Sequence, residues 1–445
     1  MFEKIFSFPF IAVVGLGKEG YSTISWLRRK GYGGKIVVAD LIEKDIPDGV
    51  DHVCFGENYL YEVSKYPIIF RAPGIPLGKL LKAGCLMNSI TSQTSFILKN
   101  CRVIGVTGTK GKSTTATLIT HILKKANIPC HLAGNIGNPF FDLPDEALNE
   151  LIVAEFSSHQ LLDIHDSPHI SVLLNIEPEH LDYYDSFDSY VQAKMNIILY
   201  QRKNDILVTS PDYIHGHQAI INARGKIITF GKSVDNNFVI NGNEIVYKDD
   251  AIINTSFLRG PHNVDNVAAA IAACSSVGIA AKNAAILAKD YIHLPYRLET
   301  ISITEGIEFI DDPLATTPEA LIKAIDTFKG KIGALICGGS ERHQDYTNAV
   351  HAIIQSGAKL VVAFPSTGER IASQIDAYAK NNGQMTPKII FTTSMEDAVL
   401  AVYNICSPGD VCLHSPGAPS FDNFKNYQEK SQAYRDAISA LKDRP

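Results

Sequence analysis

The sequence has no apolar run long enough to cross a membrane and no paired cysteines. None of its cysteines forms a CxxC motif, and several lie inside apolar runs, which favours small core residues in a reducing compartment over disulfides or a zinc site. The first residues, MFEKIFSFPFIAVVG, lack the pattern of a signal peptide, because the apolar residues run directly into a glycine turn. We therefore expect a cytoplasmic protein that does not bind a membrane. The cysteines are Cys54, Cys85, Cys101, Cys130, Cys274, Cys337, Cys406 and Cys412.

The chain also lacks an excess of positive charge. Its formal net charge is −6, and no cluster of lysine and arginine stands out that could release counterions from a nucleic acid. This excludes a general nucleic-acid binder but leaves small anionic ligands, which need only local positive groups. The 445 residues, 45% hydrophobic and 20% charged, predict about three globular domains.

β-type and helical segments alternate nearly throughout the chain, which predicts the α/β class, with parallel sheets flanked by helices. The pattern divides into three blocks, which we place at residues 1–95, 96–295 and 296–445. We expect a monomer.

The first block begins with a glycine-rich turn after a strand. FIAVVGLGKEG contains Gly15, Gly17 and Gly20, a helical run follows, and the next strand, KIVVAD, ends at Asp40, twenty residues after Gly20. This is the spacing of a dinucleotide fingerprint, in which the glycines admit a phosphate and the acid accepts from a sugar hydroxyl. The alternative is a tight βα turn. The run IIFRAPGIP predicts another strand end, with Gly74 near the same crevice.

The second block carries GVTGTKGKST at residues 105–114, between a strand-like and a helix-like run. A strict P-loop needs glycine where Val106 stands, so this is a variant. The part from Gly111 to Thr114 is intact, and it would place Lys112 on the β- and γ-phosphates and a hydroxyl on Mg²⁺. The motif favours a nucleoside triphosphate site over a structural turn.

Acidic residues follow the next strands. Glu155 ends the apolar run LIVAE, where its carboxylate could complete a Mg²⁺ shell, and Glu179, His180 and Asp182 lie just past another strand end. By pattern alone, His180 is an ordinary surface or core histidine. Lys194 lies in a helical run, and its spacing suggests only an exposed lysine.

A third motif in this block opens an alanine-rich helix. RGPHNVDNVAAA places His262, Asn263 and Asn266 at the helix start. The asparagine side chains could cap the helix or bond an adenine edge.

Together these motifs resemble the Mur ligase family over essentially the whole chain. GVTGTKGKS matches the family's ATP motif GxTGTxGKS, AEFSSHQ its acidic strand end, and HNVDN its HNxxN helix. The resemblance implies three domains: a Rossmann-like N-terminal domain, a central P-loop ATPase-like domain and a Rossmann-like C-terminal domain. It also implies a ligase that uses ATP and Mg²⁺ to form an acyl phosphate in peptidoglycan precursor synthesis. The GLGKEG turn, the APGIP loop and GNIG at 134–137 look most like members that add glutamate to UDP-N-acetylmuramoyl-L-alanine.

The resemblance assigns roles to individual residues. Those implied to bind the UDP part of the substrate are Gly15, Leu16, Gly17, Asp40, Gly74 and Asn135. Those implied to bind ATP are Gly108, Thr109, Lys110, Gly111, Lys112, Ser113, Thr114, Asn263, Asn266, Arg297 and Asp312. Those implied to bind metal are Ser113, Glu155, His180 and Lys194, the lysine being carbamylated in the family. The implied catalytic residues are Lys112, His180 and Lys194.

The acceptor pocket departs from the family pattern. Thr316 and Ser420 match, but Leu314 replaces a lysine, Arg342 replaces a lysine and Tyr427 replaces a phenylalanine. The resemblance implies that the residues at the four corresponding positions, Thr316, Arg342, Ser420 and Tyr427, bind the amino acid. Two acceptors stay as candidates. D-glutamate is the usual acceptor of these relatives, and L-glutamate is used by a branch of the family whose sequence the segment DDPLATTPE resembles more closely. Outside the class, the alternatives are an NAD-dependent dehydrogenase and a non-catalytic nucleotide-binding regulator.

Overall fold

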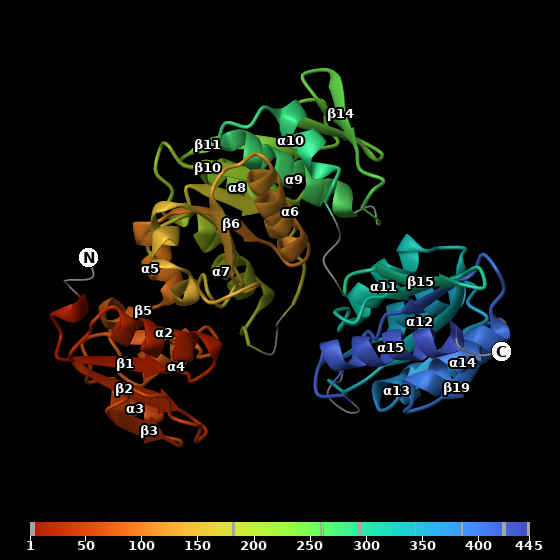
Figure 1. Ribbon diagram of the computed structural model, residues 1–445, viewed down its shortest axis with the longest axis horizontal. Helices are drawn as coiled ribbons and strands as arrows, with labels where there is room; N and C mark the ends of the chain where they lie inside the picture. The colour runs from red at the N-terminus through yellow and green to blue at the C-terminus, as the bar shows by residue number, and fades with distance from the viewer. Residues whose placement is uncertain are drawn as a thin grey trace. The chain divides into compact units, whose positions relative to one another are not determined.

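The computed structural model describes residues 5–179, 183–258, 260, 262–291, 296–342, 344–383, 386–420 and 424–442 (Figure 1). The chain divides into two compact units. The first unit comprises residues 1–257 and 262–291, and the second comprises residues 258–261 and 292–445. Among the described helices, none combines the length and the apolar character that crossing a membrane requires.

The N-terminal sheet of the first unit is parallel, with strand order β3-β2-β1-β4-β5. Its inner strands are almost wholly buried, as expected where helices cover both faces of a parallel sheet. The strands are β1 (Phe10–Val14), β2 (Lys35–Asp40), β3 (His52–Phe55), β4 (Ile69–Arg71) and β5 (Ile90–Thr91). The helices are α2 (Lys18–Arg29), α3 (Tyr59–Val63), α4 (Leu77–Lys82) and α5 (Gln93–Asn100), with a short 3-10 turn at Met87–Ser89.

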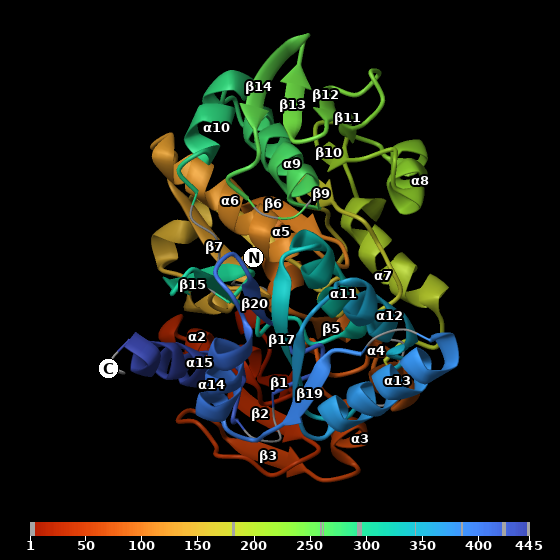
Figure 2. The ribbon, with the colours of Figure 1, turned by 90° about the vertical axis from the view of Figure 1, so that its right-hand side faces the viewer.

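The central sheet of the same unit has the order β14-β13-β12-β11-β10-β9-β6-β8-β7, and Figure 2 shows β14 to β9 side by side. It is parallel except at β13, which pairs antiparallel with both of its neighbours. The strands are β6 (Arg102–Thr107), β7 (Cys130–Gly134), β8 (Leu151–Glu155), β9 (Ile170–Leu173), β10 (Ile206–Thr209), β11 (Lys226–Gly231), β12 (Phe238–Asn241), β13 (Glu244–Tyr247) and β14 (Asp250–Asn254). The helices are α6 (Lys112–Lys125), α7 (Phe187–Leu199), α8 (Ile214–Asn222), α9 (His262–Ser276) and α10 (Ala281–Ala288), with 3-10 turns at Phe140–Asp142 and Asp145–Asn149.

The sheet of the second unit has the order β15-β16-β20-β17-β18-β19, with only β15 antiparallel to its neighbour. The strands are β15 (Glu299–Thr304), β16 (Ile307–Asp311), β17 (Ile332–Gly338), β18 (Leu360–Phe364), β19 (Lys388–Phe391) and β20 (Val411–His414). The helices are α11 (Pro318–Thr327), α12 (Thr347–Gln355), α13 (Thr367–Asn382), α14 (Met395–Ile405) and α15 (Tyr427–Lys442).

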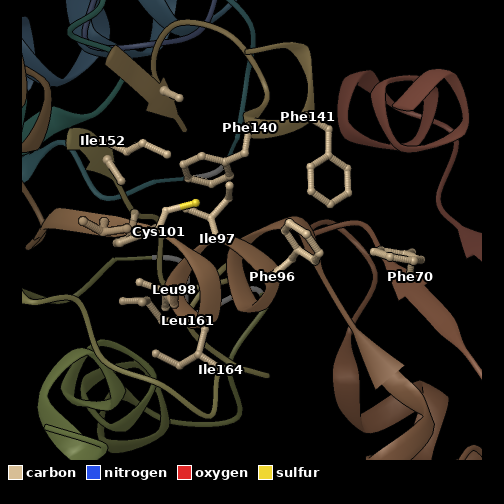
Figure 3. Close-up of a cluster of buried hydrophobic side chains, with 14 of the residues drawn as sticks. Phe70, Phe96, Ile97, Leu98, Cys101, Phe140, Phe141, Ile152, Leu161 and Ile164 are labelled. Atoms are coloured by element: carbon tan, nitrogen blue, oxygen red, sulfur yellow. The ribbon is translucent and has the colours of Figure 1, made fainter. Parts of the chain in front are cut away.

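An aromatic cluster joins the N-terminal and central sheets within the first unit. Phe70 of β4 and Phe96 of α5 converge on Phe141 of the 3-10 turn (Figure 3). Trp26 of α2 stacks on Phe141, with ring centroids 4.0 Å apart and planes 11° apart. Such a pair adds about 1 kcal/mol beyond the area that it buries. The two sheets therefore share one hydrophobic core.

A buried ion pair fixes the same junction. Arg71, which ends β4, pairs with Asp163 at 2.9 Å, and the two side chains are 0% and 1% exposed. Arg71 also donates to the carbonyl of His159, and Ser92 donates to Asp163. Arg71 belongs to the N-terminal sheet and Asp163 to the central region. Because each charge has its partner in the other region, separating the two regions would leave unpaired charges in an apolar setting.

The predicted α/β class, with parallel-dominant sheets, is confirmed. The predicted strand ends at Asp40 and Glu155 and the helices after the two glycine-rich turns are present. His180 and Asp182 lie outside the described residues.

Candidate active site

The GLGKEG turn is built around two glycines that admit no side chain. Gly15 has φ +93°, and a Cβ there would lie 2.8 Å from the Cβ of Ala72. A Cβ on Gly20 would lie 2.3 Å from the carbonyl oxygen of Gly15. A Cβ on Gly17, which precedes α2, would meet nothing within 4 Å. The turn thus packs tightly against the 72–75 loop, which contains Gly74. It stays open at the N-terminus of α2, where backbone N–H groups favour an anion.

Asp40 closes this turn from the adjacent strand. Its Oδ2 accepts from the backbone N–H of Leu16 at 2.7 Å and from Lys44 Nζ at 2.8 Å. Lys44 also donates to the carbonyl of Leu16. The predicted residues Gly15, Leu16 and Asp40 therefore form one connected group.

The second glycine-rich loop is shaped by Asn266. Gly111 has φ +83°, and a Cβ there would lie 2.2 Å from Oδ1 of Asn266. Asn266 accepts from Thr115 at 3.3 Å and donates to Asn263 at 2.8 Å. The HNVDN segment of α9 thus lies directly against the loop and the first turn of α6.

Lys112 begins α6, and its Nζ donates to the carbonyl of Thr109 at 2.8 Å. Thr109 is fixed in turn by a 3.0 Å hydrogen bond to the carbonyl of Glu177. Lys110 pairs with Glu179 at 2.5 Å, and Thr114 is half-buried in the same helical turn. This leaves the ammonium of Lys112 over the loop, beside the N-terminus of a 14-residue helix.

Glu155 links the loop to the neighbouring strand. Its side chain is buried, Oε2 accepts from Ser113 at 2.6 Å, and Oε1 accepts from Asn135 at 2.7 Å. Ser113 and Glu155 meet because β6 and β8 are adjacent and parallel, so their carboxyl ends lie at the same edge. Asn135, which we assigned to the UDP substrate, is placed at this carboxylate.

Lys194 is not the exposed lysine that its pattern suggested. Its side chain is 1% exposed, and its Nζ donates to the carbonyl of Gly108 at 2.8 Å and lies 4.8 Å from the ring centre of Tyr190. Burial, aided by the charge of Lys112, holds the pKa of Lys194 well below its ordinary value. This shift favours the neutral form of the amine.

The donor set fits Mg²⁺ in part. The hydroxyl of Ser113 and the carboxylate of Glu155 are both oxygen ligands, the kind that Mg²⁺ prefers, and they lie beside the phosphate-type loop. His180 lies outside the described residues. Within the described part of the chain, no three His, Cys, Asp or Glu side chains gather as a metal site.

In the second unit, three loops meet at the carboxyl ends of β16, β17 and β20. The backbone N–H of Ser340 donates to Pro419, that of Gly338 donates to Pro416, and that of Gly417 donates to Ala315. These bonds connect the loops that carry Thr316, Arg342 and Ser420. The predicted acceptor residues thus come from three segments that the fold binds together.

Their side chains differ in exposure. Arg342 is exposed and Thr316 is half-buried. Ser420 is 6% exposed, and its Oγ has no hydrogen-bond partner among the described residues. Tyr427 begins α15 and packs edge-on against Tyr296 at 5.5 Å.

Asp312 and Arg297 lie beside this group. Asp312 accepts from Ser415 at 3.2 Å and from the backbone N–H of Leu298 at 3.4 Å. Burial raises the pKa of Asp312 to about 7, and the nearby charge of Arg297 opposes this. Arg297 itself is exposed and reaches the carbonyl of Leu314 at 3.4 Å.

Sequence reasoning missed several ion pairs around these groups. Arg71 and Asp163 join the first two sheets, and Glu341 and Arg370 hold the loop next to Arg342. The partners are 92 and 29 residues apart, respectively. Arg71 at the end of a strand was a weak signal, and nothing in the sequence pointed to its partner.

Comparison with known proteins agrees with this geometry. The model of the Mur ligase middle domain matches residues 106–274, and that of the Mur ligase glutamate ligase domain matches residues 296–417. A UDP-N-acetylmuramoylalanine--D-glutamate ligase from Acetivibrio thermocellus is 30% identical, covering 99% of this chain and 98% of that protein. A protein of the same name from Acidobacterium capsulatum is 31% identical, covering 97% and 96%.

Solved structures share the fold at lower identity. The MurF ligase from Thermotoga maritima in complex with ADP has a TM-score of 0.61 at 18% identity, covering 98% of this chain and 99% of that one. The UDP-N-acetylmuramate-alanine ligase MurC from the same organism has a TM-score of 0.60 at 16% identity, covering 97% and 99%. With relatives matched over nearly the full length and with both domain models present, the chain belongs to the Mur ligase family.

Proposed function

We propose that this protein joins D-glutamate to the alanine carboxylate of UDP-N-acetylmuramoyl-L-alanine at the expense of ATP, in peptidoglycan precursor synthesis. One observation carries the proposal: Lys112, Ser113, Glu155 and the buried Lys194 converge on one glycine-rich loop. The names of the full-length relatives support the choice of substrates.

The amide bond requires an activated carboxylate. Transfer of the γ-phosphate of ATP to the alanine carboxylate gives an acyl phosphate and ADP. The amine of glutamate then attacks the acyl carbon, and phosphate leaves from the tetrahedral intermediate. Lys112 and the N-terminus of α6 stabilise the negative charge on the transferring group. Asn263 and Asn266 would approach the adenine side of the same nucleotide.

Ser113 and Glu155 would hold Mg²⁺ through their oxygen atoms, with His180 and a modified Lys194 serving a second ion. The metal would supply charge neutralisation for phosphoryl transfer. For Lys194, burial shifts the pKa toward the neutral amine, the form that would react with CO₂ and release a proton. The resulting carbamate carries the oxygen ligand that a plain lysine lacks.

The nucleotide-linked substrate would bind at the open end of the Gly15–Gly17 turn, with Asp40, Gly74 and Asn135. Arg297 and Asp312 would complete the ATP site, and Thr316, Arg342, Ser420 and Tyr427 would bind the amino acid. Both groups belong to the second compact unit, whereas the glycine-rich loop at 105–114 belongs to the first. The proposed reaction therefore uses residues of both units, and it requires that water be kept from the acyl phosphate. We propose domains at 1–95, 96–295 and 296–445, and a monomer acting in the cytoplasm.

L-glutamate is the second candidate acceptor. Arg342 and Leu314 stand where lysines are usual, and an arginine fork binds a carboxylate with a geometry different from that of an ammonium. The change therefore falls on the pocket that reads the configuration of the amino acid.

The test is ATP-dependent phosphate release with UDP-N-acetylmuramoyl-L-alanine and either D-glutamate or L-glutamate. Release with D-glutamate is expected, and release with only L-glutamate would select the second candidate. Release with neither isomer would overturn the proposed function. Mass analysis of the product identifies the amide, which separates ligation from ATP hydrolysis.

A further inference from the structure

The loop that carries Arg342 is held by a side chain from a separate helix. Arg370, in the first turns of α13, donates from Nε and Nη2 to the two carboxylate oxygens of Glu341, at 2.9 and 2.8 Å. Its Nη1 donates to the carbonyl of Gln344 at 2.8 Å. The guanidinium of Arg370 therefore bonds the loop on both sides of Arg342.

The rest of this loop is fixed by its ends. Ser340 is held by its backbone N–H on Pro419, and the hydroxyl of Tyr346 donates to the carbonyl of Gly417 at 2.6 Å. The guanidinium of Arg370 lies 4.8 Å from the ring centre of Tyr346. Between these two anchors, Arg370 bonds the side chain of Glu341 and the backbone carbonyl of Gln344, and these contacts help to set the course of the backbone through Arg342.

The same contact controls the charge next to Arg342. Glu341 is its immediate neighbour, and a free carboxylate there would compete for the Arg342 guanidinium and repel a dicarboxylate ligand. The fork of Arg370 neutralises Glu341 while both side chains stay only partly exposed, at 32% for Arg370 and 23% for Glu341. Arg342, itself exposed, is thereby left as a net positive group.

We infer that Arg370 is a positioning residue for the acceptor amino acid: it orients the Glu341–Gln344 segment and masks Glu341, so that Arg342 can bind the carboxylate of glutamate. This rests on the proposed function, since it takes glutamate as the acceptor. Arg370 itself touches no reacting group.

The test compares steady-state constants of Arg370→Met and wild type. We expect the KM for glutamate to rise about tenfold, because a charge-assisted clamp and the mask over Glu341 are both lost. The kcat and the KM values for ATP and for the UDP substrate should stay within about twofold. Lys359→Met is the matched control, because it breaks an ion pair with Asp410 at the amino ends of the strands of the same sheet, and it should leave the KM for glutamate unchanged.

Two further variants separate the two parts of the inference. Arg370→Lys keeps the charge but loses the two-nitrogen fork, so it should raise the KM for glutamate by only a fewfold; it also carries the test if Arg370→Met does not fold. Adding Glu341→Gln to Arg370→Met removes the unmasked carboxylate and should recover part of the lost affinity.

An unchanged KM for glutamate in Arg370→Met, or an equal rise in the KM of all three substrates, would overturn the inference alone. No turnover by the wild type with either isomer would overturn the proposed function, and the inference with it.

Discussion

The two compact units present their predicted site residues in opposite ways. In the first, Lys194, Glu155 and Asn266 are buried and already bonded to the loop that they serve. In the second, Arg297 and Arg342 are exposed and the hydroxyl of Ser420 is unpartnered among the described residues. These residues of the first unit are thus held by protein contacts, whereas two of the charged side chains of the second unit lie in solvent and one, Asp312, is buried. Preorganised groups should matter most for the rate, and exposed groups for affinity.

Removing the central cation should have the largest effect. Lys112→Ala should lower kcat by about 10³-fold, equivalent to about 4 kcal/mol, because the developing phosphate charge loses its nearest cation. The measurement is phosphate release under saturating substrates. Lys124→Ala, at the other end of α6, is the control and should keep full activity. A Lys112→Ala enzyme within tenfold of wild type would remove the contrast between the two units.

Breaking the buried junction should have the next largest effect, on stability. Arg71→Leu leaves Asp163 charged and unpaired in the core and should lower the free energy of unfolding by about 3 kcal/mol, measured by urea titration. Arg202→Leu breaks a pair of similar distance in which the arginine is 74% exposed, and it should cost less than about 0.5 kcal/mol. Equal losses in the two variants would show that burial does not govern this contact.

The pH dependence of the free energy of unfolding tests how burial affects another charged group of the first unit. Burial raises the pKa of Glu19, in the first turn of α2, from 4.5 to about 7, against a hydrogen bond from Gln160 that lowers it. Because the folded chain holds this proton more tightly than the unfolded chain, the free energy of unfolding falls as pH rises from about 4.5 to about 7. Glu19→Gln should lose this slope and gain about 2 kcal/mol over wild type between pH 5 and pH 8. The exposed Glu146→Gln should follow wild type, and parallel curves for all three proteins would contradict the assignment.

The smallest effect should come from substituting Arg342, an exposed residue of the second unit. Arg342→Ala should raise the KM for glutamate about tenfold, equivalent to about 1.4 kcal/mol, with little change in kcat, because a solvated rim charge contributes modestly. Arg342→Lys should lie between this variant and wild type. A loss in kcat with an unchanged KM would place Arg342 with the reacting groups instead of the acceptor.

The contrast also explains what sequence could predict. Glu155 could be placed beside Ser113, because carboxyl ends of parallel strands meet at one edge and both residues follow apolar runs. The burial of Lys194 could not, since the pattern of α7 does not mark which face meets the loop at Gly108. Arg71 and Asp163 are single charged residues 92 positions apart, and no local pattern joins such partners. Glu341 and Arg370 were hidden for the same reason.

The buried Arg71–Asp163 pair and the Trp26–Phe141 stack have one more consequence. They hold the GLGKEG turn and the glycine-rich loop at 105–114 on a common rigid base, so the span between the two is constant. Under the proposed function, that fixed span limits the length of substrate that can reach both sites at once. A nucleotide-linked substrate whose carboxylate is one residue too near or too far could bind by its uridine end and still not reach the phosphate, so chain length would be selected before chemistry begins.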